Sequence, residues 1–193
     1  MLRKLRITIE GIAPIILNNN TLADPAHIWA IERQSITDKK KKKTEADLVR
    51  LSELDWYGSM YTDNGKVVIP GDNIEKMLHE GGMKVRKGPQ FLAGVTSPGM
   101  WPLIYDGPKN IDKLYKDDRF RFRTLCKINK VPVIKVRPRF AAWSLAFEVH
   151  FWDDVLSEKD VTTSVETAGR IVGLCDWRPK HGRFEIREIE SIE

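Results

Sequence analysis

Basic side chains interleaved with aromatic rings lie in one segment late in the chain, at a spacing that suits binding to a polyanion. Between residues 119 and 139 there are eight Lys or Arg residues and no Asp or Glu. The eight are Arg119, Arg121, Arg123, Lys127, Lys130, Lys135, Arg137 and Arg139. Cations bind phosphate groups, and flat rings stack on bases without regard to sequence. The segment predicts a nucleic-acid surface with contacts at Arg121, Arg123, Arg137 and Arg139, and the alternative is a solvated strand face.

The sequence after Gly173 holds a second group of cations beside an aromatic ring. Its candidate contacts are Trp177, Arg178, Lys180 and Arg183. Gly173 and Gly182 can let the backbone approach a ligand closely, and arginine can hold a phosphate by two parallel hydrogen bonds. Among the candidate regions, we expect this loop most strongly to contact the nucleic acid. In the alternative interpretation it is a tight connection in which Trp177 lies over the sheet and Arg178 pairs with Asp176.

Five consecutive lysines form the densest charge in the chain. They are Lys39, Lys40, Lys41, Lys42 and Lys43. The chain has 32 basic and 27 acidic residues, a net charge of +5, so the five charges of this run equal the whole excess of basic over acidic residues. Because adjacent like charges repel one another and none can enter a core, we expect an exposed loop that an anion would order.

The sequence contains no strong residue pattern of the kind that forms a catalytic site. The four histidines, His27, His79, His150 and His181, occur singly, and the sequence has no metal-ligand spacing, nucleophile motif or phosphate-binding P-loop. We therefore expect no catalytic residues, no metal and no cofactor.

Length and composition indicate one ordinary folded domain. The 193 residues are 41% hydrophobic and 31% charged, which is enough apolar material for a core. No apolar run approaches the roughly 18 residues that span a membrane, and the N-terminus does not resemble a signal peptide. We expect a cytoplasmic protein with a single domain over residues 1–193, and insertions at about 18–58 and 83–118.

Hydrophobic periodicity and capping signals predict the elements of the first half. Residues 4–10 alternate as a strand, with Leu5, Ile7 and Ile9 inward. Asp24 before Pro25 is typical of a helix N-cap, with a short helix through Ile31. The predicted elements that follow are a helix opened by a capping box at residues 44–47 with Leu48, Leu51 and Leu54 inward, a strand at 66–69, and a helix from Asp72 that is stopped by Gly81-Gly82.

The second half begins with an irregular segment and returns to strands. Residues 83–112 are rich in Gly and Pro, which predicts a loop region anchored by Trp101. The basic segment predicts a hairpin with a turn near Asn129-Lys130. The remaining predicted elements are a strand at 143–151, a helix from the Ser157 and Asp160 capping box to Gly169, and a last strand at 183–189.

The order of these elements is β-α-β-β-α-β with insertions, which is the ferredoxin-like, RRM-like α+β plan. In RNA-recognition modules of this plan the open sheet face holds single strands. We expect Trp143, which begins the strongest alternation, to pack in the core rather than stack on a base.

Two segments resemble a known family. The string IPGDNIEKML at residues 69–78 and the string GRIVGLCDWRPKHGRFEI at residues 169–186 resemble the RAMP superfamily, the repeat-associated mysterious proteins of CRISPR effector complexes. In that family a strand ending in Ile-Pro-Gly leads into the first core helix, and a glycine-rich loop precedes the last strand. The chain departs from the family in that helix, where Asp72, Asn73, Glu75 and His79 stand in place of small hydroxyl residues followed by Lys and Arg.

The resemblance implies a backbone-like subunit, or a phage-borne relative of one, that is not an enzyme. Such subunits oligomerise as a filament or ring along single-stranded RNA, together with other effector subunits and without a membrane. A loop of the neighbouring subunit grips the RNA, and Lys39–Lys43 lies where this loop is expected.

Two other functions stay open. Some family members cleave RNA, which makes His181 a candidate general base and Asp24, by position, a candidate catalytic acid. The helix N-cap explains Asp24 without catalysis. The second alternative is a phage protein that binds DNA or a protein partner.

Overall fold

A computed structural model describes residues 1–128 and 131–192. The predicted turn at Asn129-Lys130 and the side chain of Lys127 therefore lie outside the described residues. The chain forms two compact units. The first unit consists of Met1–Ile15, Thr62–Gly107 and Phe140–Glu193, and the second of Ile16–Tyr61 and Pro108–Arg139.

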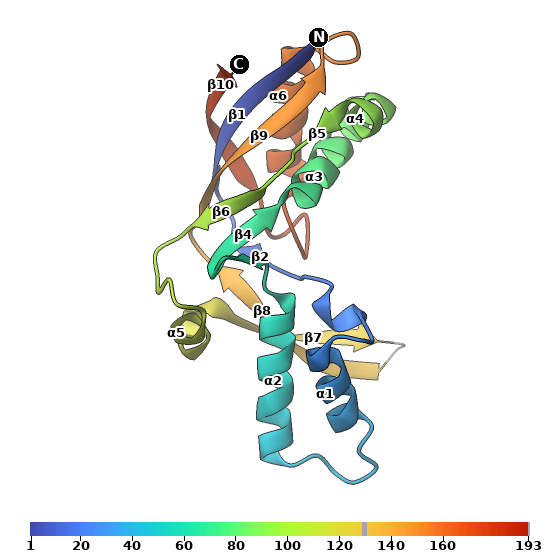
Figure 1. The fold of residues 1–193 in the computed structure, drawn as a ribbon, viewed down its shortest axis with the longest axis vertical. Helices are drawn as coiled ribbons and strands as arrows, with labels where there is room; N and C mark the ends of the chain where they lie inside the picture. The colour runs from blue at the N-terminus through green and yellow to red at the C-terminus, as the bar shows by residue number, and fades with distance from the viewer. Residues whose placement is uncertain (129–130, 193) are drawn as a thin grey trace. The chain divides into compact units, whose positions relative to one another are not determined.

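The first unit is an antiparallel sheet with helices on one face (Figure 1). Its strands are β1 (Leu2–Gly11), β3 (Thr62–Asp63), β4 (Lys66–Pro70), β5 (Val95–Thr96), β6 (Met100–Ile104), β9 (Ser144–Trp152) and β10 (Phe184–Ile192). Its helices are α3 (Gly71–Lys84), α4 (Gly88–Gly94), α6 (Glu158–Thr167) and the π-helix η3 (Ala168–Val172). The strand order is β10-β1-β9-β6-β4-β3, and β5 also pairs with β9.

The core of this unit has the ferredoxin-like plan that the sequence predicts. Taken along the chain, β1, α3, β5, β9, α6 and β10 follow the β-α-β-β-α-β order. The alternation in β1 buries Leu5, Ile7 and Ile9, and α3 packs against α6. The α+β, ferredoxin-like fold class is confirmed.

Two glycines in α3 have a different role from the predicted one. Gly81 and Gly82 do not end the helix, which continues to Lys84. A Cβ on Gly81 would lie 2.4 Å from the backbone oxygen of Ser164, and one on Gly82 would lie 2.4 Å from the ring of Phe91. The glycines therefore let neighbouring helices approach α3 closely.

The segment predicted as loop at 83–112 contains regular structure. It supplies α4, β5 and β6 to the first unit, and the second core strand is the short β5. Within the segment, the indole nitrogen of Trp101 donates to Ser97 Oγ at 3.0 Å, and Ser97 Oγ donates to the Glu148 carbonyl on β9 at 2.7 Å. The prediction failed because β5 has only two residues, too few for a visible alternation.

The second unit combines helices with a three-stranded sheet of order β2-β8-β7. Its elements are β2 (Ile15–Ile16), η1 (Thr21–Ala23), α1 (Ile28–Thr37), α2 (Glu45–Ser59), α5 (Ile111–Lys116), η2 (Asp118–Phe120), β7 (Arg121–Ile128) and β8 (Val131–Phe140). β7 and β8 form the predicted basic hairpin, in which Phe122 is directly opposite Arg137. The hairpin thus belongs to this sheet and not to the ferredoxin-like one.

Of the two predicted helix starts in this unit, that of α2 is confirmed and that of α1 is wrong. The capping box formed by Thr44 and Asp47 is present at the start of α2. Leu48, predicted to point inward, is 54% exposed, whereas Leu54 is 2% exposed. Asp24 does not cap α1, because the helix begins after His27, whose ring nitrogen accepts from the backbone N–H of Trp29. Within the described residues, no helix is both long enough and apolar enough to cross a membrane.

Candidate nucleic-acid interface

The open face of the ferredoxin-like sheet carries interleaved charges of both signs. Arg6 on β1 pairs with Glu148 on β9 at 2.8 Å, and Arg187 on β10 pairs with Glu10 on β1 at 2.5 Å. The hydrogen bond from Arg6 lowers the pKa of Glu148. On this face, arginines are therefore paired with carboxylates, which does not favour binding of a polyanion.

The loop between η3 and β10 is closed tightly by its glycines. Gly173 and Gly182 have φ values of 84° and 71°, which favour glycine. Leu174 N–H donates to the Gly182 carbonyl at 2.9 Å, and Gly182 N–H donates to the Pro14 carbonyl at 2.8 Å. A Cβ on Gly182 would lie 2.0 Å from the Leu174 oxygen, so this close approach requires glycine.

Arg178 fixes this loop to helix α3. Its guanidinium donates to both carboxylate oxygens of Glu80, at 2.8 and 3.0 Å. The side chains of Arg178 and Glu80 are 19% and 27% exposed, and such bidentate, charge-assisted bonds are strong. Arg178 therefore has a structural role, and its predicted role as an RNA contact stays a prediction.

Other side chains of the loop face solvent. Trp177 is 36% exposed, and its ring lies edge-on to His181 at 6.2 Å. Lys180 and Arg183 are exposed. The loop thus presents one aromatic ring and two cations from a backbone that hydrogen bonds hold in place, which suits a single nucleic-acid strand.

The two basic rows of the hairpin lie on opposite faces of its sheet. Residues directly opposite each other in an antiparallel pair share a face, so Arg121 and Arg123 lie with Val136 on one face. Arg137 and Arg139 lie with Phe122 on the other, where the Arg139 guanidinium is 6.0 Å from the Phe122 ring centre. The hairpin has two separate basic surfaces.

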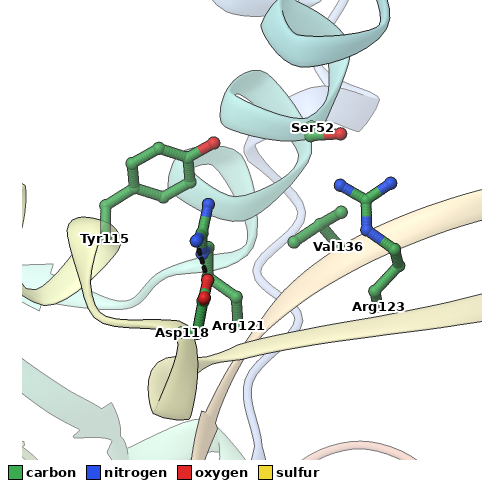
Figure 2. Close-up of a pocket in the computed structure, with 6 residues that line it drawn as sticks. All are labelled: Ser52, Tyr115, Asp118, Arg121, Arg123 and Val136. Carbon is green, nitrogen blue, oxygen red and sulfur yellow. Dashed lines mark ion pairs between the residues drawn. The ribbon is translucent and has the colours of Figure 1, made fainter.

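Arg121 and Arg123 line a pocket of about 240 Å³ (Figure 2). The other lining residues are Ser52, Tyr115, Asp118 and Val136. The Arg121 guanidinium lies 5.2 Å from the centre of the Tyr115 ring and pairs with Asp118. Arg123 is exposed. Sequence reasoning missed Ser52 and Tyr115, because nothing in the order of residues indicates that α2 and α5 meet β7.

Lys135, another cation of the hairpin, is engaged inside the second unit. Its ammonium and the guanidinium of Arg33 each lie 2.8 Å from Asp55 Oδ1, and Asp55 is 4% exposed. Burial lowers the pKa of Lys135. This buried cluster holds α1, α2 and β8 together. Lys135, one of the eight basic residues, therefore has a structural role that needs no ligand.

The lysine run connects α1 and α2. Lys39 pairs with Asp47 at 2.6 Å, and this hydrogen bond lowers the pKa of Asp47 to about 2. Lys40, Lys41 and Lys42 are exposed, and Lys43 is partly exposed. Most of the run is therefore accessible to an anion.

The two candidate catalytic residues belong to different units. Asp24 is exposed and accepts a hydrogen bond from the backbone N–H of Ala26 at 2.9 Å, while His181 lies in the loop that carries Trp177. No group of three or more His, Cys, Asp or Glu residues in the described part of the chain could hold a metal ion. Trp143 is 3% exposed and donates to the Ala13 carbonyl at 2.9 Å, so it packs in the core as expected.

The fold and these sites define the class of the protein. It is an α+β protein with a ferredoxin-like core, a tightly closed glycine-rich loop before its last strand, and a second unit that carries a basic hairpin.

Comparison with known proteins agrees at the level of the fold. No protein-family model matches the sequence, and no curated protein matches it. Among solved structures, the chain resembles one chain of the Type III-B Cmr-beta complex bound to cognate target RNA, determined by cryo-EM, with a TM-score of 0.56 and 10% sequence identity. All of this chain is covered, and it spans 61% of the length of that chain. This likeness supports the α+β fold alone.

Proposed function

We propose that this protein is a non-enzymatic subunit that binds single-stranded RNA, as in a CRISPR effector complex. The observation that carries the proposal is the glycine-rich loop, which is fixed to α3 by Arg178 and Glu80 and presents Trp177, Lys180 and Arg183 to solvent. The resemblance to a chain of an RNA-bound complex supports it.

The proposed affinity comes mainly from phosphate neutralisation. Each Lys or Arg that contacts a backbone phosphate releases a counterion, and the Trp177 ring can stack on a base of any kind. This mode of binding has little sequence preference, which suits a subunit that meets RNA of varied sequence.

The second unit, in this proposal, is an insertion within one RAMP-like domain over residues 1–193. Several copies assemble along one RNA, with or without other effector subunits. The lysine loop at residues 39–43 grips RNA that a neighbouring copy holds, and Arg137 and Arg139 add contacts. Light scattering of the protein with and without RNA tests this assembly, which requires several copies per RNA.

The test of RNA binding is fluorescence anisotropy with a labelled RNA of about 30 nucleotides, long enough for several sites of the usual size. The double variant Lys180→Gln, Arg183→Gln should bind on the order of tenfold more weakly, a loss of about 1.4 kcal/mol. The matched control is Lys66→Gln, Lys159→Gln, which removes two exposed cations from the same unit. Equal losses in both variants, or no binding by the unaltered protein, would contradict the proposal.

The other functions are outcomes of the same experiment. Tighter binding to DNA of the same sequence would make DNA the ligand. Defined cleavage of the RNA that is lost in His181→Ala or Asp24→Ala would make the protein an endoribonuclease.

A further inference from the structure

We infer that the pocket lined by Arg121 and Arg123 is a binding site for one phosphate group of a nucleotide chain. The inference deepens the proposed function and rests on it for the identity of the ligand. It assigns a defined anion site to the second unit, in addition to the loop of the first.

The strand geometry places both arginine side chains on the same face of the hairpin. Arg121 and Arg123 are two residues apart on β7, so their side chains leave the same face of the strand roughly 6.6 Å apart. Figure 2 shows both groups on the side of the hairpin that faces α2, with Val136 between them. Because both arginines line the same pocket, the inference places the phosphate between them, where it accepts a hydrogen bond from each.

The walls of the pocket favour a bound anion. Val136 is 2% exposed, and an apolar wall strengthens a nearby charge interaction because it excludes water. The hydroxyl of Tyr115 lies on the same side as the Arg121 guanidinium (Figure 2). The Ser52 hydroxyl donates to the Leu48 carbonyl at 2.9 Å and forms part of the wall.

The volume also suits a phosphate group. The pocket of about 240 Å³ is many times the roughly 10–15 Å³ that a cavity needs to hold one water molecule. A phosphate with part of its ester substituent can enter it. Arg121 is already oriented by its position over the Tyr115 ring, so little side-chain freedom is lost when it binds.

Asp118 competes with an anion for Arg121 in this pocket. Its carboxylate pairs with Arg121, yet its side chain is 88% exposed, so it can leave into water. A phosphate that binds Arg121 displaces this carboxylate. Asp118 therefore weakens binding, which predicts an effect of opposite sign to that of the arginines.

Nuclear magnetic resonance of the arginine Nε–Hε groups tests the site directly. The probes are inorganic phosphate, uridine 5′-monophosphate and the dinucleoside monophosphate UpU. Saturable shifts at Arg121 and Arg123 with any probe support the inference. Shifts with the monophosphate alone identify a terminal phosphate, and shifts with UpU identify an internal phosphodiester. The absence of saturable shifts with all three would overturn the inference.

Variants with matched controls test the sign of each contribution. For the probe that changes the arginine chemical shifts, Arg123→Gln should weaken binding about tenfold. Asp118→Asn should strengthen binding of the same probe about threefold, since a competing charge is removed. The control for the first is Lys113→Gln, an exposed cation of α5, and the control for the second is Asp38→Asn, an exposed acid at the C-terminal end of α1 in the same unit. If either variant behaves like its control, the pocket is not the site. Far-ultraviolet circular dichroism checks that each variant is folded.

Failure of this inference is distinct from failure of the proposed function. If the unaltered protein binds the long RNA, and Arg123→Gln matches Lys113→Gln, the loop binds RNA and the pocket does not. If the probes change the chemical shifts of Arg121 and Arg123 but the long RNA does not bind, the pocket is an anion site and the proposed function is wrong.

Discussion

Arg178 and Lys180 are two cations of the same loop with different surroundings. Arg178 is half-buried and donates twice to Glu80, whereas Lys180 is exposed. Arg178 therefore has a structural role, whereas the proposed function gives Lys180 a role in binding.

Substitution of the two residues should give opposite patterns. Arg178→Ala should lower the free energy of unfolding by about 1–2 kcal/mol, because it leaves the Glu80 carboxylate without its two donors. Lys180→Ala should change the free energy by less than about 0.5 kcal/mol but weaken RNA binding. Urea unfolding and RNA anisotropy of both variants measure this. A stable Arg178→Ala protein with weakened RNA binding would show that the ion pair is dispensable and that Arg178 contacts RNA.

At the residue scale, the sequence predicts the types of the site residues and not their partners. The exposed cations of the loop could be predicted because they lie close together in the chain. Glu80 could not, because it is 98 residues from Arg178 in the sequence. Which row of hairpin arginines faces α2 also depends on tertiary packing, which periodicity does not determine.

At the element scale, local signals were reliable where a few adjacent residues determine the structure. The capping boxes at the starts of α2 and α6 are both present, because they need only four consecutive residues. The prediction that Gly81-Gly82 ends the helix is wrong, because Gly81 makes room for the backbone of Ser164 and Gly82 for the ring of Phe91, and Ser164 is distant in the sequence.

The α6 capping box predicts a pH dependence of stability. A hydrogen bond from Lys87 lowers the pKa of Asp160 from 3.8 to about 2. The folded state therefore binds this proton less readily than the unfolded state, so the stabilisation is complete above about pH 5 and is lost as the pH falls towards 2.

Asp160→Asn removes this titration and keeps an oxygen that can accept the capping hydrogen bond. The variant should be less stable than the unaltered protein by about 0.5–1 kcal/mol at pH 6, because the ion pair with Lys87 is lost, and the difference should shrink towards pH 2. Urea unfolding at several pH values measures it. A difference that is constant with pH would show that the Asp160 carboxylate does not contribute through its charge.

At the scale of the whole molecule, the ferredoxin-like class was predictable from β1, α3, β9, α6 and β10, whose periodicities follow one another along the chain. The second core strand was not, because β5 has only two residues, and the predicted hairpin belongs to the other sheet. The two units were not, because the second is assembled from residues 16–61 and 108–139. The sheet face expected to hold RNA carries Arg6–Glu148 and Arg187–Glu10 pairs, so this proposal places RNA binding in the loops and the hairpin.

The salt dependence of RNA affinity tests the central claim most directly. For single strands, the slope of log K against log[salt] is about −0.7 for each phosphate neutralised. With contacts from the loop, the pocket and the lysine run, we expect a slope of about −3 or steeper. The Lys180→Gln, Arg183→Gln variant should have a slope shallower by about 1.4 than that of the unaltered protein. A slope near zero, or the same slope in both proteins, would contradict RNA binding through this loop.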